Sequence, residues 1–355
     1  MRKKKKLLYI VEAMGGGVFT YIVELANKLA EEYDLYIAYA VRSQTPEDYK
    51  DYFDKRIHLI KVENFIRAIR PVNDIKAGFE IRKIVKDINP DIIHLHSAKA
   101  GILGRLFLNK RKHKFFYTPH GYSFLMEDCN PLKRNMYKGI EKVFGMAKCK
   151  TICCSVGEYN ESLKVTKKSS FISNGIDINV LKKQMKDIQI EKHNKPIVFT
   201  IGRICEQKNP SMFNEIAKSM PNVDFVWIGD GELKEQLTSE NIKITGWISR
   251  EEVIKYAMQA DIFILTSLWE GLPISLLESM YMKKVCIVSD VVGNRDVIIN
   301  NHNGFVCKNT EHFIKRIQEN VDNLNKEVAQ KAYESIIDTY NTDMISVLYS
   351  KEYEN

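Results

Sequence analysis

Two glutamates in one short segment have the type and spacing to hold the hydroxyl groups of a sugar. Glu270 and Glu278 lie in TSLWEGLPISLLESM, residues 266–280, with seven residues between them. A carboxylate can accept hydrogen bonds from two neighbouring hydroxyls, so one glutamate could hold a sugar ring and the other a ribose. Large apolar residues flank Glu278 and predict a buried helix, where an unpaired carboxylate costs several kcal/mol. The pattern favours a binding role for Glu278 over that of an exposed helix residue.

Two cations lie upstream of this segment. Arg203 and Lys208 occur in GRICEQKN, residues 202–209, directly after a predicted strand at 196–202. A diphosphate needs its charge neutralised and is bound well by the forked donors of arginine. The same residues also fit surface charge ahead of a helix that begins near Asn209. Taken alone, this loop leaves both interpretations open.

A glycine-rich loop near the N-terminus is a further candidate for phosphate binding. Residues 14–26 read MGGGVFTYIVELA, with the loop placed between a predicted strand and a predicted helix. Bare backbone amides at a helix start suit a phosphate oxygen. The dinucleotide fingerprint fails, because its sixth position from Gly15 is Thr20, and no Gly-Lys-Ser/Thr sequence forms a nucleotide P-loop. A plain tight turn remains an alternative for this loop alone.

These candidates need a scaffold of strands that end beside one another. Short apolar runs alternate with helical periodicity along nearly the whole chain, which predicts parallel sheets covered on both faces, the doubly wound α/β architecture. Ligands bind at the carboxyl ends of such strands, so we expect a site in a cleft between two domains. The predicted strands are 7–11, 35–40, 91–96, 114–119, 150–155, 169–173, 196–202, 222–229, 242–246, 261–267, 284–290 and 304–307. The predicted helices are 19–31, 75–88, 99–109, 131–147, 208–219, 231–239, 250–259, 272–281 and 310–339.

The length of 355 residues exceeds one ordinary core and predicts two domains. We expect one Rossmann-like domain at 1–175 and a polar linker at 176–195. A second Rossmann-like domain should then occupy 196–335. The last segment, 336–355, is predicted to be a helix that crosses back to the N-terminal domain.

Charge and composition restrict the class of protein. Residues 1–170 carry 32 Lys and Arg against 19 Asp and Glu, whereas residues 171–355 carry 21 against 26. The basic first half indicates an anionic partner there, although a solvated lysine-rich surface is an alternative. No segment has the length and apolarity of a membrane span. Seven scattered cysteines are typical of reduced thiols in a cytosolic protein.

Taken together, the motifs resemble the large family of retaining, GT-B-fold nucleotide-sugar glycosyltransferases often called family 4. The two glutamates, the two cations and the glycine loop occur in the family's order along essentially the whole chain. The resemblance implies transfer of a sugar from a nucleoside diphosphate to an acceptor hydroxyl with retained anomeric configuration. It also implies that 1–175 is the acceptor-binding domain and 196–335 the nucleotide-sugar-binding domain. UDP is favoured as the commonest donor nucleotide among similar enzymes. No cofactor is implied beyond the donor substrate, and the lack of an Asp-x-Asp motif after a strand predicts metal independence.

The resemblance implies roles for the matching side chains. Arg203 and Lys208 match the pair that holds the diphosphate and stabilises its developing charge, while Glu270 matches the glutamate on the donor sugar and Glu278 the one on the ribose. His120, in KFFYTPHGYSF at 114–124, matches an active-site histidine near the transferred sugar. A core or capping histidine remains an alternative for this position. No general base is assigned, because in such enzymes the leaving phosphate is thought to take the acceptor proton.

Backbone groups complete the implied nucleotide site. One departure from the family is Pro273, which stands where many relatives have glycine and has no N–H to donate to the sugar. The further matching positions are Gly16, Gly17, Gly231, Trp247, Ile248, Leu272, Ile274 and Ser275.

The first half suggests the acceptor. HLHSAKAGILGRLF, residues 94–107, is similar to transferases that extend lipid-linked glycans for bacterial surface polysaccharides, and Ser97, Lys99 and Arg105 are the acceptor candidates. His94 and His96 favour structural roles over a metal pair. Segment 131–147 reads as a basic amphipathic helix, which predicts peripheral attachment to the anionic inner face of the cell membrane. The alternative is that this helix packs on the sheet with its lysines in water.

Other classes of function are less compatible with the sequence. No nucleic-acid-binding motif appears, and the basic residues are not interleaved with aromatic residues for stacking, so nucleic acid is not an expected partner. A nucleotide-sugar epimerase on the same scaffold remains an alternative, which would act without an acceptor. A glycan-binding relative without activity is a second alternative, disfavoured because both glutamates and both cations are present.

Overall fold

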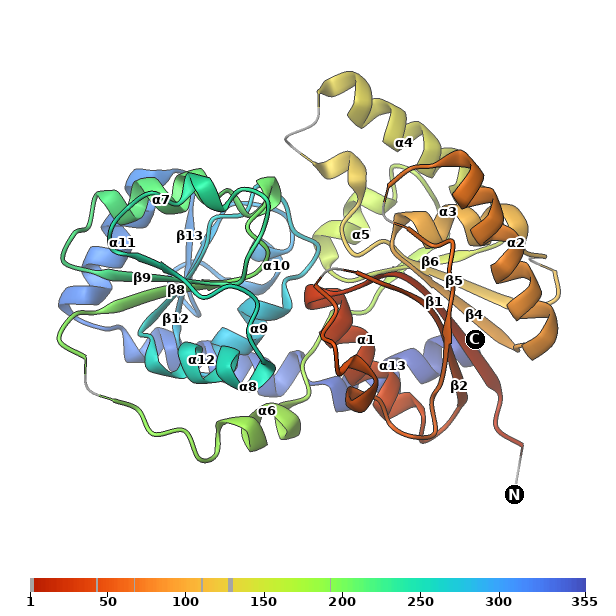
Figure 1. The fold of residues 1–355 in the computed structure, drawn as a ribbon, viewed down its shortest axis with the longest axis horizontal. Coiled ribbons are helices and arrows are strands. Elements are labelled where there is room, and N and C mark those ends of the chain that lie inside the picture. The colour runs from red at the N-terminus through yellow and green to blue at the C-terminus, as the bar shows by residue number, and fades with distance from the viewer. Residues whose placement is uncertain (1–2, 43, 67, 110, 127–129, 192) are drawn as a thin grey trace. The chain divides into compact units, whose positions relative to one another are not determined.

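The chain folds into two compact units, shown in Figure 1. This computed structural model describes residues 3–355 except 43, 67, 110, 127–129 and 192. The first unit comprises Met1–Leu125, Cys129–Asn174 and Thr342–Asn355, and the second comprises Met126–Asp128 and Gly175–Asn341. Each unit contains one parallel sheet with helices between successive strands, so the predicted doubly wound α/β class is confirmed.

The sheet of the first unit has seven strands in the order β3-β2-β1-β4-β5-β6-β7. The strands are β1 (Lys6–Met14), β2 (Asp34–Val41), β3 (His58–Lys61), β4 (Ile92–His96), β5 (Lys114–Thr118), β6 (Lys150–Cys153) and β7 (Ser169–Phe171). The central strands are fully buried, which fits their continuous Val, Ile, Leu and Tyr runs. The strand order reverses direction between β1 and β4, the switch point at which such sheets bind ligands.

Helices cover both faces of this sheet. They are α1 (Gly16–Leu29), α2 (Pro71–Ile88), α3 (Ala98–Phe107), α4 (Pro131–Gly145), α5 (Val156–Ser162) and α13 (Thr342–Glu354). Helix α13 packs against α1, although more than 300 residues separate them in the sequence. Its Tyr349 and Tyr353 are completely buried. The last helix of the chain therefore belongs to the core of the first unit.

The second unit repeats the scheme with six strands in the order β10-β9-β8-β11-β12-β13. Its strands are β8 (Ile197–Ile201), β9 (Asp224–Ile228), β10 (Ile242–Ile244), β11 (Ile262–Leu265), β12 (Val285–Ser289) and β13 (Phe305–Cys307). Its helices are α6 (Ile178–Met185), α7 (Pro210–Lys218), α8 (Arg250–Gln259), α9 (Ile274–Tyr281), α10 (Asn294–Val297), α11 (Thr310–Asp322) and α12 (Lys326–Thr339). A core of buried aromatic and aliphatic side chains, Trp227 and Phe213 among them, lies between these layers.

Several elements differ from the sequence prediction. Strand β3 was missed because it is short and half exposed, so it has no continuous apolar run. The segment predicted as a linker contains α6, which begins where the Asp177 carboxylate accepts hydrogen bonds from two backbone N–H groups. The single helix predicted over 310–339 is two, because Asn325 caps a new helix by accepting from the N–H of Val328. The helix predicted at 231–239 is only a 3₁₀ turn at Lys234–Gln236.

Six cysteines are buried free thiols, and Cys129 lies outside the described residues. Across the part of the chain that the structure describes, no helix combines the length and apolarity needed to cross a bilayer.

Candidate active site

In the second unit, the side chains predicted to bind the donor gather at the carboxyl edge of three adjacent strands. Arg203 and Lys208 lie in the segment after β8, the glycine turn 229–231 follows β9, and Glu270 follows β11. Because β9, β8 and β11 are neighbours in the sheet, segments more than 60 residues apart end side by side. The fold thus places Lys208 in contact with Glu270, and it places Arg203 on the same loop as Lys208.

Lys208 and Glu270 form an ion pair that is largely shielded from water. The Lys208 ammonium donates to Glu270 Oε1 at 2.6 Å, and their side chains are 14% and 7% exposed. Ser267 Oγ donates to the same oxygen at 2.7 Å, and Gln207 Nε2 donates to the backbone carbonyl of Trp269. A carboxylate held in this way has a fixed orientation, and the ammonium keeps donors for an incoming anion because it has three protons.

Arg203 is less committed to protein partners. Among the described residues its only recorded polar contact is with Glu232, where the closest N–O separation is 4.0 Å, beyond hydrogen-bond distance. The loop that carries Arg203 is held by the strand beside it, because Trp227 Nε1 on β9 donates to the carbonyl of Gly202 at 2.8 Å. The guanidinium of Arg203 is therefore positioned by its loop and available to an anion.

A glycine turn supports the same loop. Gly231 lies so close to it that a Cβ atom would come within 2.2 Å of the Ile204 carbonyl oxygen. Gly229 has φ of +141°, and a Cβ there would meet the Gly202 carbonyl at the same distance. Hydrogen bonds from the Ile204 N–H to the Asp230 carbonyl and from the Leu233 N–H to the Ile204 carbonyl join the two segments. Glycine is needed here for backbone contact, and Gly231 acts through its main chain.

Glu278 is buried on α9 and is held by an arginine that the sequence analysis missed. Its side chain is 3% exposed, and both carboxylate oxygens accept from the Arg250 guanidinium, with Nη1 to Oε2 at 3.0 Å. The forked arrangement is typical of strong arginine–carboxylate pairs. The available signal was the position of Arg250 at the start of α8, directly after the Gly246–Trp247–Ile248 loop, but nothing local specifies its partner.

The start of α9 and the loop before α8 offer backbone and aromatic groups. Pro273 is the residue before α9, and the amides of Ile274 and Ser275 open the helix without recorded backbone acceptors within the described part of the chain. Leu272 is buried beside them. Gly246 has φ of +73°, and Trp247 next to it is 50% exposed. These amides and this indole face remain candidates for nucleotide contacts.

In the first unit, left-handed backbone conformations gather at the carboxyl edge of β1, β4 and β5. Positive φ occurs at Gly16 (+56°), Ser97 (+78°), His120 (+56°) and Gly121 (+96°). Such conformations are costly for non-glycine residues and cluster at functional sites. Helix α1 begins at Gly16, three residues earlier than predicted, so Gly16 and Gly17 belong to its first turn. The positive φ values at Ser97 and His120 make this edge of the first sheet a candidate binding surface.

His120 is held from two sides. His96 Nδ1 lies 3.1 Å from His120 Nε2, and the Gly121 N–H donates to Glu158 Oε1 at 2.6 Å. Glu158 is completely buried and also accepts from the N–H of Cys154 at 2.8 Å. Burial lowers the pKa of His120 below its usual value, so its imidazole is neutral at physiological pH. Glu158 was missed, although Ser155 three residues earlier, whose Oγ caps α5, marks a helix start.

The three acceptor candidates differ in whether their side chains already have hydrogen-bond partners within the protein. Arg105 is 2% exposed, donates to Glu141 Oε2 at 3.1 Å and lies over the ring of Tyr117. Lys99 donates to the carbonyls of Ile66 and Ala68 and to Asp74 Oδ1, at 2.6–2.8 Å. Lys99 and Arg105 already donate to these internal acceptors, so the structure lends no support to their roles as acceptor-binding residues, which stay predictions.

Ser97 remains a candidate. It precedes α3 in a left-handed conformation, and its hydroxyl oxygen is buried with no hydrogen-bond partner among the described residues.

The histidines on β4 do not form a metal pair with other ligands. His94 Nδ1 is 2.6 Å from the Tyr353 hydroxyl and its Nε2 is 2.9 Å from Thr118 Oγ1, which agrees with a structural role. Over the described ranges, no cluster of three or more His, Cys, Asp or Glu side chains could hold a metal ion.

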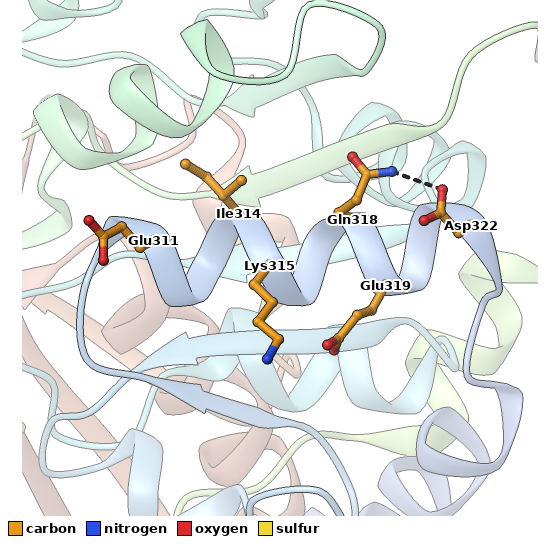
Figure 2. Close-up of a pocket in the computed structure, with 6 residues that line it drawn as sticks. All are labelled: Glu311, Ile314, Lys315, Gln318, Glu319 and Asp322. Atoms are coloured by element: carbon orange, nitrogen blue, oxygen red, sulfur yellow. Dashed lines mark hydrogen bonds between the residues drawn. The ribbon is translucent and has the colours of Figure 1, made fainter.

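One surface depression lies away from these residues, on α11. Figure 2 shows that its lining side chains all come from this one helix, with Gln318 Nε2 donating to Asp322 Oδ1 at 2.8 Å. Exposed side chains at helical spacing do not converge on a ligand, so this depression has the character of an ordinary solvated helix face.

Comparison with known proteins gives two family matches that lie one after the other along the chain. The family model described as Glycosyltransferase Family 4 matches residues 15–180. The model described as Glycosyl transferases group 1 matches residues 182–335. The boundary between the two matches lies at the start of α6.

Named relatives and solved structures agree with these matches. The chain is 32% identical over 290 residues to the UDP-Gal:alpha-D-GlcNAc-diphosphoundecaprenol alpha-1,3-galactosyltransferase of Escherichia coli, covering 73% of each protein. It is 25% identical over 358 residues to a Campylobacter jejuni alpha-1,4-N-acetyl-D-galactosaminyltransferase that acts on a diNAcBac-PP-undecaprenol-linked glycan, covering 92% of each. Its fold matches sucrose-phosphate synthase from Thermosynechococcus elongatus with a TM-score of 0.81 at 15% identity, over 99% of this chain and 98% of the other.

Proposed function

Because this chain belongs to the glycosyltransferases of family 4 and has the GT-B fold, we propose that it transfers a sugar from a UDP donor to a polyprenyl-diphosphate-linked glycan. The transfer would extend a glycan for a cell-surface polysaccharide with retention of the anomeric configuration. The names of the E. coli and C. jejuni relatives support the lipid-linked acceptor, and the E. coli name supports UDP.

The observation that carries the proposal is the cluster of Arg203, Lys208 and Glu270 at one sheet edge. Departure of a nucleoside diphosphate develops negative charge on its phosphate, and a preorganised pair of cations stabilises that charge. The 2.6 Å contact between Lys208 and Glu270 couples this phosphate site to a carboxylate that can bind sugar hydroxyls. A sugar and its phosphate can therefore be held by one connected group of side chains.

Glu278 and the amides of α9 complete the donor site in this proposal. The Arg250 guanidinium orients the buried carboxylate of Glu278, and the oxygen lone pairs that Arg250 does not use can accept from ribose hydroxyls. The Ile274 and Ser275 amides, at a helix start, suit a phosphate oxygen. Gly16 and Gly17 present amides of the same kind at the start of α1.

In the proposed mechanism His120 binds and orients, and it does not take the acceptor proton. A neutral imidazole can donate one hydrogen bond to a substrate oxygen. The proton of the acceptor hydroxyl passes to the departing phosphate on the same face of the sugar, so the new bond forms on the face that the diphosphate leaves. Arg203 and Lys208 supply the charge neutralisation, so the proposal needs no metal ion.

Product analysis tests this function. The protein would be incubated with UDP-sugars and an undecaprenyl-diphosphate-linked saccharide, and the anomeric configuration of the product would be read by proton NMR. Conversion of the UDP-sugar without any acceptor would favour the epimerase alternative. Binding of glycan without turnover would favour the non-catalytic alternative.

Substitution of the two cations tests the site itself. Lys208→Ala and Arg203→Ala should each lower turnover by ~100-fold or more, as does removal of a preorganised donor to a developing charge. Lys218→Ala, at an exposed position on α7, is the matched control and should retain full turnover. Near-normal turnover in both site variants would refute the assignment of the diphosphate site.

We also propose that α4 attaches the protein to the anionic inner face of the cell membrane. Leu132, Met136 and Val143 are 80%, 53% and 61% exposed, and their spacing of four and seven residues places them on one helix face. Glu141, on the opposite face, is the buried residue of this helix. The apolar stripe of α4 therefore points to solvent, which supports the membrane proposal over the alternative that this helix packs on the sheet with its lysines in water.

The charge of α4 supports a lipid surface as the occupant of this stripe. Lys133, Lys138 and Lys142 flank the stripe, and each cation near an anionic bilayer contributes about 1 kcal/mol. Vesicles with anionic lipids should sediment the protein at low salt, and neutral vesicles should do so much less. A triple Leu132→Ser, Met136→Ser, Val143→Ser variant should lose binding, whereas Ile190→Ser, which alters another exposed apolar residue, should not. Absence of binding by the unaltered protein would end the membrane proposal.

A further inference from the structure

We propose that His96 is a positioning residue that fixes the tautomer of His120, so that His120 presents its Nδ1–H as a hydrogen-bond donor. This inference rests on the proposed role of His120 in binding substrate. It identifies which atom of His120 meets the substrate and why that atom carries the proton.

The two imidazoles form one hydrogen-bonded unit at adjacent strand ends. His96 is the last residue of β4 and is completely buried, and His120 follows β5, the neighbouring strand. Their Nδ1 and Nε2 atoms are 3.1 Å apart, and the ring planes differ by 23° with centroids 5.3 Å apart. This separation is too long for face-to-face stacking and fits an N–H···N bond between nearly coplanar rings. One nitrogen must donate and the other must accept.

The neighbouring His94 shows how the proton positions can be read from the bonds. Thr118 Oγ1 donates its single proton to the Ile152 carbonyl at 2.8 Å, so it accepts from His94 Nε2 at 2.9 Å. His94 Nδ1 is then the acceptor for the Tyr353 hydroxyl at 2.6 Å. Every polar atom of the His94 ring is satisfied, and its tautomer follows from a backbone carbonyl that can only accept.

The same reasoning decides between the two tautomers of His96. Its Nε2 is buried and has no hydrogen-bond partner among the described residues. If His120 Nε2 donated to His96 Nδ1, the His96 proton would lie on Nε2 and would be an unpaired buried N–H. Orphaned buried donors are rarer than orphaned acceptors, and the lost hydrogen bond disfavours this state by about tenfold or more. His96 therefore carries its proton on Nδ1 and donates it to His120 Nε2.

The remaining proton of His120 must then lie on Nδ1. Burial lowers the pKa of both His96 and His120, so neither ring gains a second proton near neutral pH. The backbone that carries the His120 ring is held in place, because the Gly121 N–H is bound to the buried Glu158 carboxylate. His120 can offer a donor to a substrate oxygen but has no free lone pair with which to act as a base.

Nitrogen NMR on the unaltered protein tests the tautomer directly. Protein labelled with ¹⁵N at histidine gives long-range proton–nitrogen correlations that separate protonated from unprotonated ring nitrogens. The His120 and His96 signals would be assigned by their loss in His120→Gln and His96→Asn. We expect protonated Nδ1 and unprotonated Nε2 in both residues. A protonated Nε2 on His120 would overturn the inference.

Two substitutions at position 96 separate a positioning role from simple packing. In His96→Asn the side-chain amide can still donate near the original Nδ1, whereas His96→Leu fills the space without a donor. The Leu variant should show a redistributed His120 tautomer and a kcat about 3- to 10-fold lower, the effect of one hydrogen bond, with a smaller change in KM. The Asn variant should keep the tautomer and most of the turnover. Equal tautomer populations and equal turnover in both variants would overturn the inference.

The outcomes for this inference and for the proposed function are distinct. The tautomer is measured without substrate, so a wrong tautomer refutes the role of His96 whatever reaction the enzyme performs. If the tautomer is as expected but His120→Gln retains full turnover, the proposed substrate contact of His120 fails and the tautomer assignment stands.

Discussion

Acidification should destabilise the first unit, because it buries His94, His96 and His120 in their neutral form. Burial lowers the pKa of His94 and His96 well below the usual value, and both side chains are fully inaccessible to water. In the unfolded chain the same residues have pKa values of about 6.5. At His94 and His96 together, the unfolded state therefore binds up to two more protons than the folded state as the pH falls well below 6.5, and His120 adds to the same difference.

The size of the effect follows from that proton difference. The free energy of unfolding rises with pH wherever the unfolded state binds more protons, so this contribution is complete above pH ~6.5 and is lost as the pH falls. Each proton corresponds to about 1.4 kcal/mol per pH unit, so His94 and His96 together give about 2.7 kcal/mol per unit. Between pH 6.5 and 5 the loss from these two residues is about 3 kcal/mol, because each unfolded histidine is only half protonated at pH 6.5; this is a large part of the ~5–15 kcal/mol that stabilises a typical domain.

Urea unfolding at a series of pH values would measure this slope. Tryptophan fluorescence reports the second unit, since Trp227, Trp247 and Trp269 all lie there, while far-UV circular dichroism reports both units. Carboxyl groups also titrate on acidification, so the informative quantity is the difference between variants. His96→Asn should reduce the slope by about 1.4 kcal/mol per pH unit, and the exposed His302→Asn should leave it unchanged.

Two results would refute this reasoning. One is a circular dichroism transition of the unaltered protein whose stability does not fall between pH 6.5 and 5. The other is an unchanged pH slope in His96→Asn, which would mean that His96 is protonated in the folded protein.

Three further predictions concern the second unit and the reaction. Arg250→Ala should destabilise the second unit by about 3–5 kcal/mol, because it leaves the Glu278 carboxylate buried and unpaired. Adding Glu278→Gln to this variant should recover much of the lost stability. Urea unfolding followed by tryptophan fluorescence measures the effect, and an unchanged midpoint in Arg250→Ala would mean that the ion pair is unimportant. Gly231→Ala should lower the free energy of unfolding by about 1–3 kcal/mol, because the new Cβ would lie 2.2 Å from the Ile204 carbonyl oxygen. Gly139→Ala on α4 should raise it by up to about 1 kcal/mol, because a Cβ there has no neighbour within 4 Å. Thermal denaturation would measure both effects. Transfer should proceed at the same rate with excess EDTA, because Arg203 and Lys208 neutralise the diphosphate; a rate restored only by a divalent cation would contradict this.

Short-range patterns predicted much of the fold and part of the candidate site. The alternation of apolar runs with helical periodicity predicted the parallel sheets, since both features act over a few residues. Arg203, Lys208 and Glu270 follow adjacent strands, so topology alone brings them together. The half-exposed β3 has no such pattern and was missed.

Pairings between distant residues could not be predicted in the same way. Arg105 meets Glu141 36 residues later, and Lys99 meets Asp74 25 residues earlier, so the sequence showed two cations but not that their charge was already matched. Helix α4 carries apolar residues on more than one face, and only the docking of the helix determines that Leu132 is exposed. The coupling of His96 to His120 likewise depends on the register of β4 against β5.

The return of α13 to the first unit has a consequence for how the protein matures on the ribosome. The second unit is continuous in the sequence from Gly175 to Asn341 and can fold once residue 341 has emerged. The first unit must wait for Tyr349 and Tyr353, which are translated after the second unit and fill the interior of the first. Until then His94 lacks its hydrogen-bond partner, the Tyr353 hydroxyl, and the part of the core that Tyr349 and Tyr353 fill stays exposed to water. The order of synthesis and the order of completion are thus opposite, and a chain that stopped before Thr342 would lack core residues of the first unit although its second unit was already made.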